Sequence, residues 1–90
     1  MIEQTLELRG IPLSHLLSYL IECGGTAKSD TLPIFVTGDG WQAEILREET
    51  VTITSRFRVT AVFIHFTAAD EASFTRLMER FRLKVLRVGG

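Results

Sequence analysis

"GIPLSHLLSYLIECGG", residues 10–25, predicts a short amphipathic helix with a defined beginning and a defined end. Pro12 suits the first turn of a helix, where its missing N–H removes no hydrogen bond. Apolar residues then recur at the i, i+3, i+4, i+7, i+8 spacing of one helix face. They are Leu13, Leu16, Leu17, Leu20 and Ile21. Because glycine adopts the left-handed conformation that follows many helices, Gly24 and Gly25 should end this helix, which we place at residues 12–23.

The stretches around this helix have the composition of strands. Residues 2–9 alternate apolar and polar side chains, as a half-buried strand does. Residues 26–31 are polar and predict a loop. Further strands are expected at residues 32–36, 41–46, 51–56 and 57–66, with polar turns at 38–40 and 47–50. Pro33 should make the first of these an edge strand or delay its start.

A second amphipathic helix is predicted at about residues 68–81, with Thr67 as its N-cap and Asp70 completing a variant of the capping box. Its apolar face consists of Phe74, Leu77, Met78 and Phe81. A short tail should follow and dock against the fold through Leu83, Val85, Leu86 and Val88. The order β-α-β-β-β-β-α predicts one α+β domain over residues 1–90, a two-layer sandwich of an antiparallel sheet with both helices on one face.

The two helices can cover only one face of this sheet. We expect the covered face to carry Val62, Ile64 and Phe66 of the long strand. The side chains that alternate with these would then lie on the open face: Val59, Ala61, Phe63 and His65. Its neighbours on the open face would be Glu7, Glu44, Thr52 and Thr54. An apolar strip on an open face favours an interface. The sequence therefore predicts a homodimer that uses Val59, Phe63 and His65; a ligand groove is the alternative.

The composition is that of an ordinary globular protein, with 46% hydrophobic residues, 23% charged residues and a net charge of −1. No apolar run reaches the roughly 20 residues that cross a bilayer and no signal peptide opens the chain, so we expect a cytoplasmic protein without membrane contact. Cys23 is the single cysteine, and with two histidines it matches no zinc-site spacing. We expect neither a metal nor a cofactor.

No catalytic arrangement emerges from the sequence. His15 and Tyr19 lie one helical turn apart, as surface polar residues of an amphipathic helix commonly do. Cys23 closes the first helix, where the negative end of the helix dipole disfavours a thiolate, and a buried structural role is the better interpretation. We therefore expect a protein that is not an enzyme.

Basic residues gather in the last third of the chain. Residues 1–55 hold three basic and eight acidic side chains (net −5), whereas residues 56–90 hold seven basic and three acidic ones (net +4). The group Arg76, Arg80, Arg82 and Lys84 is a candidate anion-binding site. The alternative is a cationic helix end, which the helix dipole favours in any protein. The overall charge is too low for a dedicated nucleic-acid binder.

The pair Gly89-Gly90 is a candidate carrier tail, because a tail without side chains can enter the active site of an adenylating enzyme. The alternative is an ordinary glycine terminus.

Several of these stretches together resemble one known family. They are "LRGIPLSHLLSYLIECGGT" (8–26), "GDGW" (38–41), "DEASFTRLMERF" (70–81) and "RVGG" (87–90). They resemble the C-terminal domain of proteins related to MoaD, the small subunit of molybdopterin synthase, a domain of unknown function. The resemblance implies a TBP-like β-α-β4-α fold and a role near molybdenum-cofactor synthesis or sulfur transfer. It supplies no catalytic residues.

The expected function is therefore that of an accessory domain that binds a partner protein of cofactor biosynthesis or an anionic small molecule. One alternative is a sulfur carrier activated at its C-terminal glycine. Another is nucleic-acid binding through a TBP-like sheet, which Glu7 and Glu44 on the open face disfavour.

Overall fold

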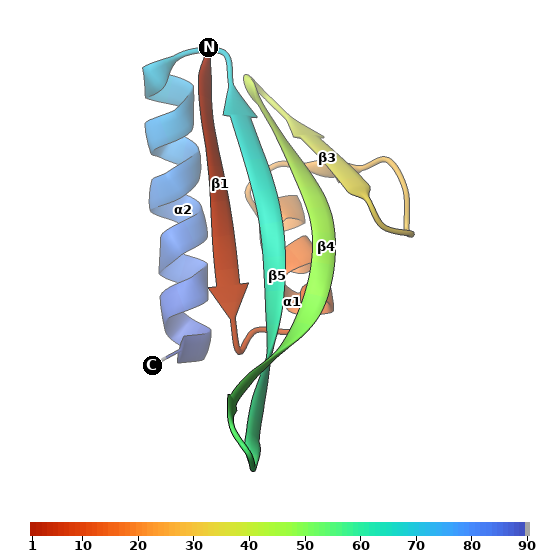
Figure 1. Cartoon of the computed structure of the whole chain (residues 1–90). Coiled ribbons are helices and arrows are strands. Elements are labelled where there is room, and N and C mark those ends of the chain that lie inside the picture. Colours follow the sequence, from red (N-terminus) through yellow and green to blue (C-terminus); the bar gives the residue numbers. More distant parts are fainter. Residues whose placement is uncertain (90) are drawn as a thin grey trace.

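The chain folds into one antiparallel sheet with two helices packed on one of its faces (Figure 1). The computed structural model describes residues 1–89, with side chains described up to Leu86. The elements are β1 (Ile2–Arg9), α1 (Leu13–Glu22), β2 (Thr26–Ala27), β3 (Ile34–Gly38), β4 (Trp41–Thr54), β5 (Phe57–Ala68) and α2 (Glu71–Gly89). The strand order is β1-β5-β4-β3-β2. This confirms the predicted two-layer α+β sandwich.

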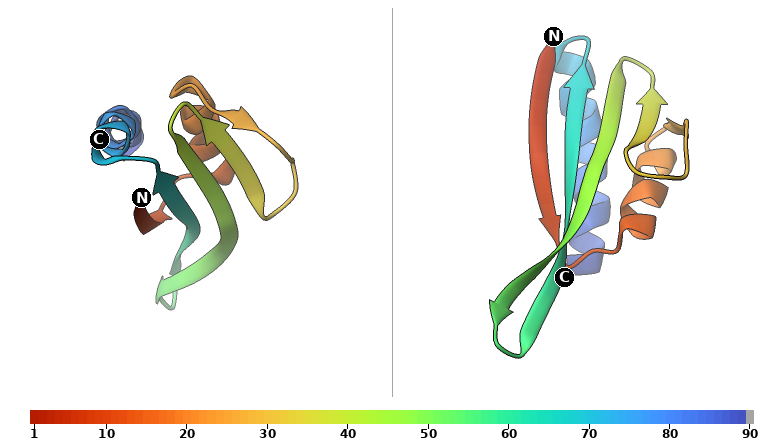
Figure 2. Two further views of the ribbon diagram at one scale, coloured as in Figure 1. Left: turned by 90° about the horizontal axis from the view of Figure 1, so that it is seen from above. Right: turned by 45° about the vertical axis from the view of Figure 1, so that its right-hand side comes forward.

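The core lies between the sheet and the two helices, which sit side by side on one face when the molecule is viewed from above (Figure 2, left). Val62, Ile64 and Phe66 of β5 are fully buried there, as the alternation of the strand predicts. The rings of Phe66 and Phe81 meet edge to face, with their centroids 5.4 Å apart. This contact ties α2 to the centre of the sheet.

The first helix is confirmed, with bounds one residue inside the prediction at each end. Pro12 directly precedes α1, and its carbonyl accepts the N–H of Leu16 at 3.2 Å. Gly24 ends the helix at a φ of 99°, which a side chain would strain. β3 starts at Ile34, so Pro33 delays the strand as predicted; the edge position belongs to β2 instead.

The strand boundaries differ from the prediction in the middle of the chain. Residues 47–50 do not form a turn, because they pair with β5 inside the continuous strand β4. The predicted strands 41–46 and 51–56 are thus largely one strand, and the chain turns at Ser55-Arg56. The short strand β2 lies in the predicted loop 26–31. The order β-α-β-β-β-β-α is therefore as predicted, although the four strands between the helices are not the four that were predicted. Polar side chains do not disfavour a strand that is exposed to solvent, and this misled the turn assignment.

An irregularity in β4 changes which side chains share a face. Ile45 pairs with Ile64, but the next pair is Arg47 with Phe63, so Leu46 is an extra residue in β4. The alternation therefore shifts by one, and Thr52 faces the same side as Arg58, away from the open face. The prediction that Thr52 lies beside Val59 on the open face is wrong; Val51 lies there instead.

The second helix starts later and runs further than predicted. Thr67 belongs to β5, and Asp70 is the cap: the Ser73 N–H donates to its Oδ1 at 2.8 Å. The helix continues to Gly89, so residues 82–89 are helical and do not form a tail. Leu83 and Leu86 are 63% and 67% exposed, which contradicts their predicted docking. Gly90 lies outside the described residues.

Residues 50–60 form an arm that extends beyond the body of the sheet (Figure 2, right). Their ladder partners are only one another, because β1 pairs with β5 from Ala61 onward and β3 pairs with β4 up to Ile45. We call this hairpin the arm. Within residues 1–89, no helix combines the length and the apolar character needed to cross a membrane.

Candidate functional site

A pocket of about 370 Å³ opens where the end of α1, the turn between β3 and β4, and the first half of α2 meet. It is lined by Cys23, Gly24, Asp39, Trp41, Ser73, Arg76, Leu77 and Arg80. The volume lies within the range of about 300–1,000 Å³ that is usual for small-molecule sites. This pocket is the candidate functional site.

The helix α2 supplies one wall because its lining residues share one face. Ser73, Arg76, Leu77 and Arg80 follow the i, i+3, i+4, i+7 spacing. Leu77 is 3% exposed and packs in the core, which fixes the rotation of the helix. The two arginines therefore border the pocket with exposed side chains, and the Arg76 Nη2 lies 3.5 Å from the Ser73 Oγ.

Glycines allow the other two walls to come close. A Cβ on Gly25 would lie 2.5 Å from the Val36 Cγ1 and 2.8 Å from the Trp41 ring, so a side chain there would push the end of α1 away from the sheet. A Cβ on Gly40 would lie 2.7 Å from the Ser73 Oγ, so this glycine lets the β3–β4 turn approach α2. The close approach of these elements places Trp41 against the pocket.

Cys23 contributes a neutral thiol to the pocket. The side chain is buried, as predicted, and burial raises its pKa above the ordinary value. Lys84 and Arg80 lie near enough to lower the pKa in part, while Glu22 raises it. The thiol is therefore protonated at neutral pH and acts as a wall group, not as a thiolate.

The lining carries a net positive charge. Arg76 and Arg80 bring two positive charges against the single carboxylate of Asp39. No ion pair within 4.0 Å joins either arginine to an acidic side chain of residues 1–86. Two arginines without a carboxylate partner can bind an anion, because the guanidinium group forms paired hydrogen bonds with phosphate and carboxylate.

The structure divides the predicted basic group. Arg76 and Arg80 line the pocket, and Lys84 lies beside it, with its Nζ 3.4 Å from the Glu22 Oε1. Arg82 is exposed and is not part of the lining, since a residue two positions from Arg80 points to another side of the helix. Asp39 and Trp41 could not be predicted as site residues, because nothing local in "GDGW" indicates that this turn meets α2.

The three predicted interface residues occupy two different places. Val59 is half-buried in the arm. Phe63 and His65 lie on the body of the sheet, on the face without helices. The Arg47 guanidinium lies 4.1 Å from the centre of the Phe63 ring, so a cation covers part of that ring. The open face is therefore more polar around Phe63 than the alternation of the strand alone suggests.

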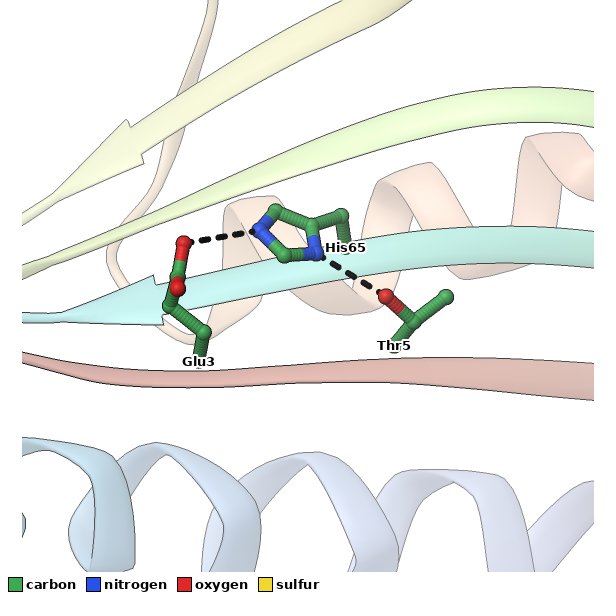
Figure 3. A network of polar contacts seen from close by, with 3 residues as sticks. All are labelled: Glu3, Thr5 and His65. Carbon is green, nitrogen blue, oxygen red and sulfur yellow. Dashed lines mark hydrogen bonds and ion pairs between the residues drawn. The ribbon is translucent and has the colours of Figure 1, made fainter.

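His65 lies between a hydroxyl and a carboxylate on the neighbouring strand β1 (Figure 3). The Thr5 Oγ1 is 2.9 Å from its Nδ1, and the Glu3 Oε1 is 3.4 Å from its Nε2. Thr5 is the register partner of His65, and Glu3 lies two residues away on the same face. Cross-strand neighbours at this spacing contact one another in any antiparallel sheet. Ordinary strand pairing therefore explains the contacts among Glu3, Thr5 and His65.

A metal centre has no basis in the described part of the chain. Among residues 1–89, no three His, Cys, Asp or Glu side chains are grouped so that they could hold an ion. The pocket brings a cysteine and one carboxylate together with two arginines, and such positive charge opposes cation binding.

Comparison with known proteins places the chain in a family. No curated protein matches it. A family model described as archaeal MoaD-like protein matches residues 4–90, which is nearly the whole chain and includes every residue that lines the pocket. The chain therefore belongs to the archaeal MoaD-like protein family.

Proposed function

We propose that this protein is a binding domain that holds an anionic small molecule in the pocket between α1, α2 and the β3–β4 turn. The observation that carries the proposal is the position of Arg76 and Arg80, which are brought together in a pocket of small-molecule size and have no carboxylate partner among the described side chains. The family supports a place near molybdenum-cofactor synthesis or sulfur transfer.

A phosphorylated compound fits this lining best. Arg76 and Arg80 would bind the phosphate, since each guanidinium presents a planar set of N–H donors to its oxygens. Trp41 and Leu77 lie beside the arginines, but they are only 8% and 3% exposed and so offer little apolar surface. The exposed lining is therefore mostly polar, which suits a phosphate group. A phosphorylated pterin or a nucleotide is thus the ligand class to test.

The competing explanation is that the arginines only neutralise the end of α1. The carbonyls at a helix C-terminus carry partial negative charge, and nearby cations stabilise it. Both explanations place Arg80 near Cys23. They differ in one consequence: an anion-binding pocket gives saturable binding that depends on Arg80, whereas dipole compensation gives none.

The two other functions find less support. A carrier would present Gly89 and Gly90 on an extended tail, but α2 keeps Gly89 within the helix, so the last turn would have to unwind first. A TBP-like nucleic-acid domain would use the open face of the sheet. That face carries Glu3, Glu7 and Glu44, which would repel phosphates.

The test is a thermal-shift titration with pyrophosphate, GMP and a phosphorylated pterin. A ligand at 100 times its Kd stabilises the fold by about 2.7 kcal/mol, so at least one of these probes should raise the Tm by several degrees. Arg80→Gln should abolish the shift. Arg82→Gln is the matched control, because it removes the same charge from the same helix outside the pocket, and it should leave the shift nearly intact.

Salt gives a second readout. Binding should weaken as ionic strength rises, because partly exposed charges are screened over about 8–10 Å at physiological salt. If no probe gives a shift, or if Arg80→Gln and Arg82→Gln reduce it equally, the pocket is not the anion site and the arginines serve the helix ends.

A further inference from the structure

The arm, residues 50–60, has one apolar face that nothing in the described structure covers. Alternation along β5 places Phe57 and Val59 on the same side, and the register sets Val51 opposite Val59. Ile53 is a second extra residue of β4, at the tip of the arm, because Thr52 pairs with Arg58 and Thr54 pairs with Phe57. Phe57 is 56% exposed and Ile53 is 49% exposed. Val51, Phe57 and Val59 thus form an apolar strip on a ribbon of two strands, and the exposed Ile53 lies at the tip.

The other face of the arm is polar, so the arm is amphipathic. It carries Thr50, Thr52, Arg58 and Thr60. The arm projects past the ends of both α1 and α2, so neither helix packs on it (Figures 1 and 2). A hairpin of two strands that packs on nothing else is at best marginally stable in water. An apolar face of this kind indicates that the arm is built to be covered.

We propose that a second copy of this chain covers the arm, in a two-fold dimer in which each arm lies along the open face of the other protomer's sheet. The charges of the two surfaces are complementary. The arm carries no acidic side chain; Arg56 lies in the turn at its tip, and Arg58 lies on its polar face. The open face of the sheet carries four carboxylates and two arginines, a net charge of −2: Glu3, Glu7, Glu44, Glu49, Arg9 and Arg47.

This complementarity favours a copy of the same chain over other partners. In a two-fold dimer the contact between arm and open face forms twice, because each protomer offers one basic tip and one acidic face. The apolar strip of the arm would lie over the partner's Phe63, whose ring is partly covered by Arg47 and lies on the same side of the sheet as the acidic residues. A nucleic acid would be attracted by the tip and repelled by the face beside it.

The test is sedimentation equilibrium of the full chain at roughly 1–100 µM, the range in which specific complexes of moderate affinity are populated. The protein should sediment at twice its monomer mass of 10.1 kDa in the upper part of this range. Phe57→Glu should shift the equilibrium to monomer. A central interface residue contributes a factor of about 30 or more, and the two-fold axis applies the change twice, so the dimer Kd should rise by about 1,000-fold.

Thr52→Glu is the matched control, because it adds the same charge to the same arm on the opposite face. It should leave the dimer Kd within about threefold of the parent. Val59→Glu is a second interface variant that should act as Phe57→Glu does, and circular dichroism would verify that all three variants fold. A monomer at the highest concentration would overturn the proposal, as would a dimer that Phe57→Glu and Val59→Glu leave unchanged or that Thr52→Glu weakens equally.

Discussion

Replacing Phe81 by alanine tests whether α2 is held on the sheet as described, and thereby whether its arginines face the pocket. Phe81 is 1% exposed and meets the fully buried Phe66 edge to face. Truncation of a buried phenylalanine costs about 3–5 kcal/mol, through lost burial and the cavity that remains. The total stability of a chain of this size is about 5–13 kcal/mol. Phe81→Ala should therefore remove a large part of it, measured as the free energy of unfolding in urea.

Leu83→Ala is the control for this measurement. Leu83 lies two residues further along the same helix and is 63% exposed, so its truncation should change the free energy of unfolding by no more than about 0.5 kcal/mol. The result that would refute the reasoning is a loss below about 1 kcal/mol for Phe81→Ala, or equal losses for the two variants. Either would mean that the helix faces the sheet with a different side and that Arg80 does not line the pocket.

Two further predictions concern the two ends of α2. Asp70 accepts a hydrogen bond from the Ser73 N–H, which lowers its pKa below the ordinary value of 3.8. The stabilisation by this hydrogen bond is present above the ordinary pKa and is lost as pH falls through the lower pKa of the folded state. Asp70→Ala should therefore lower the Tm at pH 7, and the Tm difference between variant and parent should vanish in strong acid. A Tm difference that persists unchanged in acid would contradict this. At the other end, incubation with an adenylating enzyme, ATP and a sulfur donor should leave the intact mass unchanged; a gain of about 16 Da that deletion of Gly90 abolishes would establish a carrier instead.

The sequence predicted the parts of the fold that depend on local pattern. The spacing of leucines between Pro12 and Gly24 is a local signal, and α1 follows it closely. In the same way, the alternation of β5 predicted the burial of Val62, Ile64 and Phe66. The residues under the helices could therefore be named before the structure was known.

The predictions were wrong where one local sequence pattern is compatible with two different structures. Residues 47–50 are polar enough for a turn, and only their pairing with β5 shows that they continue a strand. The extra residue Leu46 then reversed the faces of the following side chains, which no alternation in the sequence reveals. Thr67 and Asp70 are both good caps, and the length of β5 decided between them.

The candidate site could be predicted only in part. Arg76 and Arg80 share a helix face, so their grouping is local, but Arg82 was included because sequence proximity does not separate the sides of a helix. Asp39 and Trp41 reach the pocket through the fold alone, from a turn more than 30 residues away in the chain. The spacing of residues in one sequence contains no sign of that contact.

The most direct test of the anion-binding pocket is a titration of ¹⁵N-labelled protein with pyrophosphate, followed by NMR. The proposal predicts saturable shifts of the Gly24 amide, the Arg80 amide and the Trp41 indole N–H, because these groups border the pocket from three different elements. The same titration of Arg80→Gln should show no saturation at these signals. Unchanged spectra at millimolar pyrophosphate, or shifts confined to Arg56 and Arg58 in the arm, would contradict the account.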